Sequence, residues 1–138
     1  TYKRLEVRAP EVQDFSQIKE PYREFALGID VTFFDKLGNP ESHLKANYAK
    51  ENINEKLWEA RGDVVVVNEK GEQINTEQLF WDVKKEIIYS NVFVKIATGD
   101  EVIMGDGFEA DQNFTSYKIK GNVKGEIQIE EKEDGEDD

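Results

Sequence analysis

The feature that most constrains this sequence is a repeat of about 30 residues, carried by hydrophobic spacing rather than by identical letters. One eighteen-residue interval recurs three times, between Ala46 and Val64, Thr76 and Val94, and Gly105 and Val123. Successive intervals begin 30 and then 29 residues apart. A period of about 20 to 50 residues is typical of stacked supersecondary units, none of which buries its hydrophobic face alone. The chain should therefore be an array of similar units packed side by side.

Around one valine of each unit, hydrophobic residues alternate with positions that hold either polar or apolar residues. Val31 is the matching valine of a stretched upstream copy of the unit. Around Val64, for example, the same parity holds Trp58, Ala60 and Val66. A strict period of two indicates strands with one buried face. The residues that this parity predicts to point inward are Phe25, Phe33, Trp58, Val64, Val66, Trp81, Ile88, Val94, Ile96, Phe108, Tyr117, Ile119 and Val123.

Residues 42–62 are ambiguous when taken alone, because they also fit an amphipathic helix. Ser42 is a suitable N-cap, Leu44 and Tyr48 are four residues apart, and Gly62 is a suitable stop. The corresponding residues 74–91 of the next unit are rich in β-branched and aromatic side chains, and glycines interrupt the unit after that. Since stacked units share one conformation, we predict two strands here, with a corner at residues 51–56.

The rest of the chain fits the same plan. Residues 2–9 alternate as a strand, residues 11–22 are irregular with one possible helical turn, and residues 25–34 form a single predicted strand. Polar corners rich in turn-forming residues are predicted at 35–40, 68–71, 82–86, 98–100 and 111–113. The predicted fold is all-β, with roughly ten short antiparallel strands in a bent sheet whose two faces enclose the apolar parity.

Length and charge limit the classes of function. A chain of 138 residues forms one domain, here residues 1–129, followed by the acidic segment 130–138, which we expect to be a disordered, solvated tail. The formal net charge of −12 argues against nucleic acid as a partner, because that affinity depends on Lys and Arg at phosphates. The absence of cysteine excludes disulfides and thiol catalysis.

No group of residues predicts a catalytic or metal site. His43 is the single histidine and lies in a polar turn region, where an exposed loop residue is the simpler interpretation. The segment starting at Asp111 resembles the start of a calcium loop, but Ser116 occupies the position of the required glycine and Asn122 that of the bidentate glutamate. We therefore expect no enzyme activity, no cofactor and no metal.

The sequence from Tyr2 to Ile127 resembles the LptC-like periplasmic components of the lipopolysaccharide export bridge, in the LptA/LptC/OstA β-jellyroll superfamily. The departures from the family pattern are a long insert at residues 10–25 and a missing amino-terminal membrane helix. The segments that carry the resemblance are YKRLEVRAPEV, GIDVTFFDKLGNPESHLKANYA, LWEARGDVVVVN, QINTEQLFWD, IYSNVFVKI and GDGFEADQNFTSYKIKGNVKG.

The resemblance implies an open, twisted antiparallel β-jellyroll whose interior shields the acyl chains of lipopolysaccharide. All the inward residues above except Tyr117 would line that groove. The protein would be periplasmic, anchored in the inner membrane through an N-terminal segment absent from this chain. Its partners would be the membrane subunits of an ABC transporter and an LptA-like jellyroll protein. The edges that meet these partners would carry Leu5 and Val7 at one end, and Lys118, Lys120, Val123 and Lys124 at the other.

Two other classes of function remain open. One is a structural or adhesion-type β-domain with a closed core and no lipid ligand, and the other is a carbohydrate-acting domain that uses exposed Trp and Tyr. The interior and the edges distinguish them, because a lipid carrier needs an unfilled interior and unpaired end strands.

Overall fold

A computed structural model of the chain describes residues 4–129, and within that range it holds fourteen β-strands and no helix. The strands are β1 (Arg4–Arg8), β2 (Gln13–Phe15), β3 (Tyr22–Phe25), β4 (Ile29–Phe34), β5 (Pro40–Ala46), β6 (Tyr48–Asn52), β7 (Leu57–Val67), β8 (Gln73–Asp82), β9 (Ile87–Ser90), β10 (Val94–Ala97), β11 (Glu101–Gly105), β12 (Gly107–Asp111), β13 (Tyr117–Lys120) and β14 (Lys124–Ile127).

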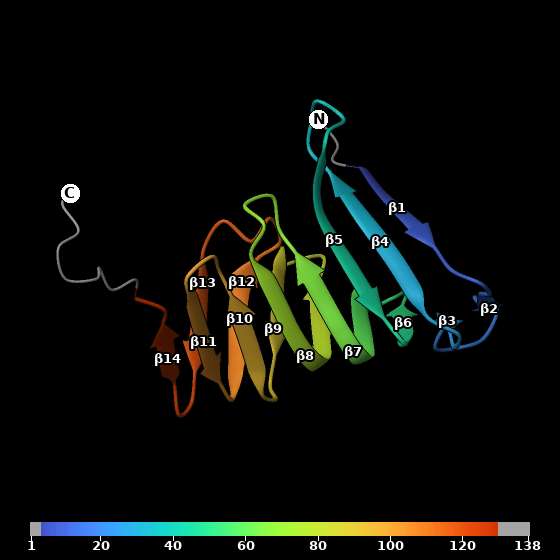
Figure 1. Cartoon of the computed structure of the whole chain (residues 1–138). Helices are drawn as coiled ribbons and strands as arrows, with labels where there is room; N and C mark the ends of the chain where they lie inside the picture. The colour runs from blue at the N-terminus through green and yellow to red at the C-terminus, as the bar shows by residue number, and fades with distance from the viewer. Residues whose placement is uncertain (1–3, 130–138) are drawn as a thin grey trace, which may run out of the picture.

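All strands pair antiparallel in one sheet that is folded into two layers (Figure 1). Layer A has the order β1-β4-β5-β7-β8-β10-β11-β14, and layer B has the order β2-β3-β6-β7-β8-β9-β12-β13. The long strands β7 and β8 bend and belong to both layers. In β7 the bend is a bulge between Arg61 and Val64, where the pairing register with β8 shifts. The predicted all-β, open antiparallel jellyroll is confirmed, with more strands than expected.

The chain crosses between layers along one long side, which we call the spine, at residues 9–12, 26–28, 47, 62–63, 77, 91–93, 106 and 121–123. The opposite side, which we call the rim, carries the hairpin turns within each layer. The turns at 35–39, 68–72 and 98–100 belong to layer A, and those at 16–21, 53–56, 83–86 and 112–116 belong to layer B. Every predicted polar corner lies on the rim, where the chain reverses direction at the surface.

Glycine is required at the spine where backbones approach closely. Gly62 has φ +79°, and a Cβ there would lie 3.1 Å from the Cβ of Asn47. The Asn47 amide donates to the Gly62 carbonyl at 2.9 Å. A Cβ at Gly105 would collide with the side chain of Ile119 in the other layer. Small residues thus let the two layers meet along this line.

The strand register explains the eighteen-residue interval. Across layer A, Val64 lies opposite Thr76, Thr76 opposite Val94, and Val94 opposite Gly105, in one row beside the spine. Val31 is the exception, because it belongs to the next row toward the rim, with Leu44 and Val66. The predicted equivalence of Val31 and Val64 is therefore wrong by two residues. Its inward parity is nevertheless correct, because a shift of two keeps the same face.

Three local predictions are corrected. Residues 11–22 contain no helical turn; they form β2, the turn at 16–21 and the start of β3, because Asp14 and Arg23 pair across a short hairpin. The single strand predicted at 25–34 is split at the spine, where Gly28 has φ +111° and Leu27 is 63% exposed. Val123, which was predicted to be inward, is 54% exposed, because it lies just before β14, the edge strand of layer A.

The strand interpretation of residues 42–62 is confirmed. They form parts of β5 and β7 with β6 between them, and the turn at 53–56 falls inside the predicted corner. Most of the core lies between the layers and comes from the predicted parity, with Val64, Val94, Ile96 and Phe108 fully buried. The acidic tail predicted at 130–138 lies outside the described residues.

Candidate lipid-binding interior

An apolar hollow lies between the two layers in the half of the molecule nearer β1. Layer A contributes inward side chains of β1, β4 and β5, including Leu5, Val7 and Phe33, and layer B contributes those of β6 to β9, including Trp58 and Trp81. The cavity volume of this hollow is only about 30 Å³, and its lining is almost wholly hydrophobic. The hollow is narrow, because the side chains of the two layers approach each other closely.

Aromatic side chains form the wall of this hollow. Trp58 and Trp81 lie opposite each other on β7 and β8 and stack with centroids 6.2 Å apart. Phe33 of layer A meets Trp81 of layer B edge-on at 5.4 Å, so the two layers touch through these rings. Phe25 stacks on Trp58 at 5.9 Å. The indole Nε1 of Trp81 donates to Oε1 of Gln112 at 3.2 Å. Such walls suit aliphatic chains, and the polar edge of Trp81 faces the rim.

The rim is open beside this hollow. A wide cleft of about 1400 Å³, open solvent included, separates Phe34 and Lys36 of layer A from Val83, Glu86 and Gln112 of layer B. Leu5, Phe33 and Trp81 line both the cleft and the hollow, so the two spaces lie next to each other. The charges around the cleft include Arg4 and Lys36 on one side, with Glu41 and Glu86 among the acidic residues.

The half of the interior nearer β14 is filled. Val94, Ile96 and Phe108 are fully buried, and Phe114 is 2% exposed. The lining of the hollow ends at Ile88 of β9 and includes no residue of β10 to β14. The interior is therefore divided into a hollow half and a packed half.

The predicted groove residues fall into four groups. Those that line the hollow are Phe33, Trp58, Trp81 and Ile88. Those buried in the core without lining the hollow are Phe25, Val64, Val66, Val94, Ile96 and Phe108, while Ile119 is partly buried against that core and Val123 is exposed. The prediction missed Ile29, Leu44 and Leu79 as lining residues, although each lies on the inward parity. It assigned Leu5 and Val7 to an edge alone, whereas they also line the hollow.

The ends of both layers lie at opposite sides of the molecule (Figure 1). Among the described strands, β1 and β2 end the layers on one side, and β14 and β13 end them on the other, each with one neighbour. Lys118 and Lys120 project outward from β13, and Nζ of Lys120 lies 3.4 Å from Glu109. Lys124 on β14 lies 3.5 Å from Glu126 of the same strand. The residues predicted for the edges are therefore on edge strands, except Val123, which lies just before β14.

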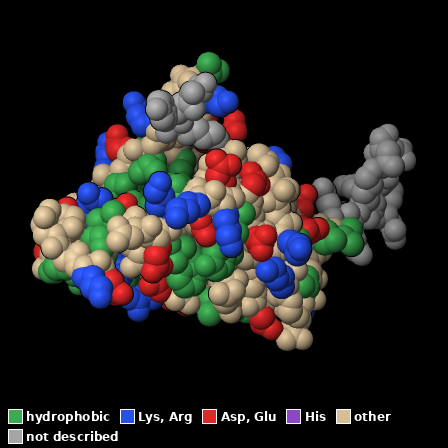
Figure 2. Space-filling view, turned by 180° about the vertical axis from the view of Figure 1, so that it is seen from behind, with side chains coloured by type: hydrophobic (Ala, Val, Ile, Leu, Met, Phe, Trp, Pro, Cys, Tyr) green, Lys and Arg blue, Asp and Glu red, His purple; other side chains and the backbone are tan. Residues whose placement is uncertain are grey.

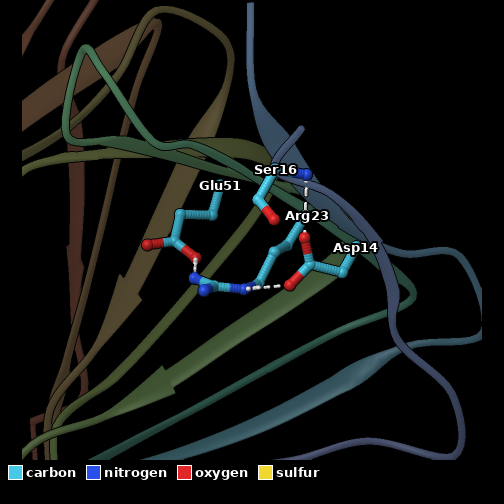
Figure 3. Close-up of polar contacts among 4 residues, drawn as sticks. All are labelled: Asp14, Ser16, Arg23 and Glu51. Atoms are coloured by element: carbon cyan, nitrogen blue, oxygen red, sulfur yellow. Dashed lines mark hydrogen bonds and ion pairs between the residues drawn. The ribbon is translucent and has the colours of Figure 1, made fainter. Parts of the chain in front are cut away.

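A charged cluster on the inward face of layer B was not foreseen. Figure 3 shows the Arg23 guanidinium between two carboxylates, with Nη1 at 2.8 Å from Oε1 of Glu51 and Nε at 3.1 Å from Oδ2 of Asp14. These residues share one cross-strand row with Trp58 and therefore its face. Hydrogen bonds from Arg23 to Glu51 and then Asp14 raise the pKa of the guanidinium. The apolar cross-strand row through Trp58 thus ends in charged residues at the β2 side. The sequence contains a sign of this cluster, because Arg23 lies two residues before the inward Phe25 and therefore on the same face.

Figure 2 shows the face seen from behind, where lysine and arginine side chains alternate with acidic ones and hydrophobic groups lie in separate patches. No single-sign field covers this face. Residues 4–129 contain no group of side chains suited to a metal ion and no helix able to cross a membrane. His43 lies on exposed β5 surface, with Nδ1 3.2 Å from Oγ1 of Thr32.

Comparison with known proteins was informative at the level of family and fold. The family model described as "Lipopolysaccharide-assembly, LptC-related" matches residues 9–128. A crystal structure described as LptH, the LptA-homologous periplasmic component of the lipopolysaccharide transport device from Pseudomonas aeruginosa, matches with a TM-score of 0.68. The sequences are 10% identical, and the match covers 91% of this chain and 96% of that one. At this identity the similarity establishes the fold alone. A search of curated proteins found no match.

Proposed function

The chain belongs to the LptC-related family of lipopolysaccharide assembly, and from this premise we propose that its interior binds the acyl chains of lipopolysaccharide during transport. The role is that of a carrier without catalysis, periplasmic in location. An anchor in the inner membrane would lie outside this chain. The ABC transporter and an LptA-like jellyroll would be its partners on either side.

The observation that carries the proposal is the apolar hollow between the layers, which shares Leu5, Phe33 and Trp81 with the rim cleft. Each methylene group moved from water into such a space contributes about 0.8 kcal/mol, so ten of them contribute about 8 kcal/mol before the costs of ordering. The narrowness of the hollow means that the layers must separate to admit a chain. The rim cleft between the two layers is the side from which a chain would enter.

The balanced charge around the rim cleft supports acyl chains rather than the anionic headgroup as the main source of affinity. Arg4 is held 4.1 Å above the ring of Phe34, and acidic residues stand nearby. A dedicated phosphate site would need several converging cations.

Photo-crosslinking in cells tests the proposal. A photoreactive phenylalanine analogue at Phe33 or Trp81 should capture lipopolysaccharide, because both side chains line the hollow. The same probe at exposed Lys95, on the opposite face of β10, should not. Equal capture at Lys95 would indicate nonspecific surface association and contradict the proposal.

The packed half of the interior favours one alternative, a structural β-domain with a closed core. That function predicts no lipid at any interior position and no lipid retained through purification. Mass spectrometry of extracts from the purified protein separates the two, since a carrier should retain lipid with long acyl chains.

A further inference from the structure

The side chain of Phe114 is buried, although the residue lies in a polar turn. It lies in the rim turn between β12 and β13, in the polar segment 112–116, yet its side chain is 2% exposed and belongs to the buried core. The two residues before it, Gln112 and Asn113, line the open rim cleft. The turn therefore faces the cleft at one point and sends a large ring into the interior at the next.

The backbone of Phe114 is strained. Its φ of +56° lies in the left-handed region, which bulky side chains rarely adopt. The other described non-glycine residues with positive φ are all polar or charged and all exposed or at turns: Lys56, Asp63, Glu86 and Asn122. Strain of this kind persists only where the surroundings impose it, and it concentrates at elements that switch.

Asp111 holds the turn in this conformation. Its carboxylate accepts hydrogen bonds from the Ser116 amide at 2.9 Å, the Thr115 hydroxyl at 2.8 Å and the Asn113 amide at 3.3 Å. The Phe114 amide donates to the Asp111 carbonyl at 2.9 Å. Gln112 also joins the turn to the hollow by accepting the indole N–H of Trp81. The turn that carries the ring is thus held by polar contacts at the rim.

One inward row of layer B runs through both halves of the interior. Trp58, Trp81 and Ile88 line the hollow, and the same row continues through Ala110 to Tyr117 at the β13 edge. The hollow ends at Ile88, where the filled half begins. A lipid that enters at the rim near β1 therefore meets a continuous apolar floor that is covered beyond Ile88.

We infer that Phe114 is a removable plug that confines acyl chains to the half of the interior nearer β1, and that its displacement extends the hollow to the β13–β14 end. This inference rests on the proposed binding of acyl chains. Phe114 thereby determines how much acyl chain the protein holds and whether the lipid reaches the edge from which it would leave.

The test uses the purified full chain, lipopolysaccharide and a photoreactive phenylalanine analogue at one of two aromatic positions. Phe33 reports on the hollow, and Tyr117 reports on the far end of the same interior. The native chain should be labelled at position 33 and only at background at position 117. With Phe114→Ala, labelling at position 117 should rise to a level comparable with position 33.

Two further variants guard against misfolding. Asp111→Ala leaves the ring of Phe114 intact but removes the hydrogen bonds that hold its turn, so labelling at position 117 should also rise. Phe108→Leu trims a buried ring of the same half that lies on a strand paired on both sides, so labelling at position 117 should stay at background. Thermal melts and unchanged labelling at position 33 establish that each variant is folded.

The outcomes separate this inference from the proposed function. Labelling at position 33 with no increase at position 117 in either Phe114→Ala or Asp111→Ala overturns the plug and leaves lipid binding intact. Strong labelling at position 117 in the native chain also overturns it. Absence of labelling at both positions in every variant contradicts the proposed function and this inference with it.

Discussion

Val94 and Lys95 are adjacent on β10 but face opposite ways, so one substitution made at both positions isolates the effect of parity. Val94 is fully buried and lies between Thr76 and Gly105 in layer A. Lys95 is exposed and lies between Asn75 and Met104, with no cross-strand carboxylate opposite it. Aspartate at position 94 should destabilise the fold severely, and aspartate at position 95 should not.

The magnitude follows from the surroundings of Val94. Losing a fully buried valine side chain costs about 1.5–3 kcal/mol. Neither cross-strand neighbour is free to donate to the new carboxyl, because the Thr76 hydroxyl already donates to the Phe93 carbonyl at 2.8 Å and Gly105 has no side chain. An unpaired buried polar group costs about 1–3 kcal/mol more, even in its protonated form. The total of about 2.5–6 kcal/mol is a large part of the roughly 5–15 kcal/mol that stabilises a typical domain.

Urea denaturation followed by circular dichroism measures both variants. Val94→Asp should lower the free energy of unfolding by at least about 2.5 kcal/mol or prevent folding. Lys95→Asp should stay within about 0.5 kcal/mol of the native chain, as surface substitutions usually do. Equal losses at the two positions would refute the assignment of faces and the repeat alignment on which it depends.

Three further predictions concern the spine, the rim and the edge. Gly62→Ala should destabilise the protein more than Gly71→Ala, since both glycines have φ near +80° but only the first has a neighbour that a Cβ would crowd; similar melting temperatures would contradict the close approach at the spine. Burial alone would raise the pKa of Asp111, but hydrogen bonds from Ser116, Thr115 and Asn113 outweigh burial and lower the pKa below its usual value. The stabilising effect of the Asp111 carboxylate is therefore present above about pH 4 and is lost as the pH falls through the lowered pKa. Asp111→Asn should therefore lower the melting temperature at neutral pH and approach the native chain in acid; a constant gap in melts across pH would rule this out. Lys124→Pro should abolish capture of a jellyroll partner in a pull-down while leaving the melt nearly unchanged, because β14 is an exposed edge; full binding by the folded variant would locate the interface elsewhere.

The arrangement of strands was largely predictable because parity and turn chemistry are local properties. Polar corners such as residues 83–86 and 98–100 must reverse in water, and the alternation around Val64 and Val94 fixes which face is buried. The register of Val31 was not predictable from spacing. It depends on the crossing at Gly28 and on the bulge at Gly62, and each changes the count of residues between rows.

The extent of the hollow could not be read from the sequence, because it depends on how side chains from two layers meet. Phe114 lies in a turn of polar residues, where hydrophobic spacing gives no reason to place it in the core. Arg23 and Glu51 lie on the inward parity but carry charge, and only their cross-strand pairing shows how that charge is neutralised. Long-range packing therefore decides which part of a predictable sheet is available to a ligand.

The double layer gives each end of this sheet a pair of free strands instead of one. An isolated extended peptide could add to β14 or to β13, but it would extend one wall and leave the other bare. A partner that adds a strand to each layer at once must itself have two layers that diverge at a similar angle. Fidelity in choosing a neighbour would then come from matching wedge shapes, a criterion that backbone hydrogen bonds alone do not supply.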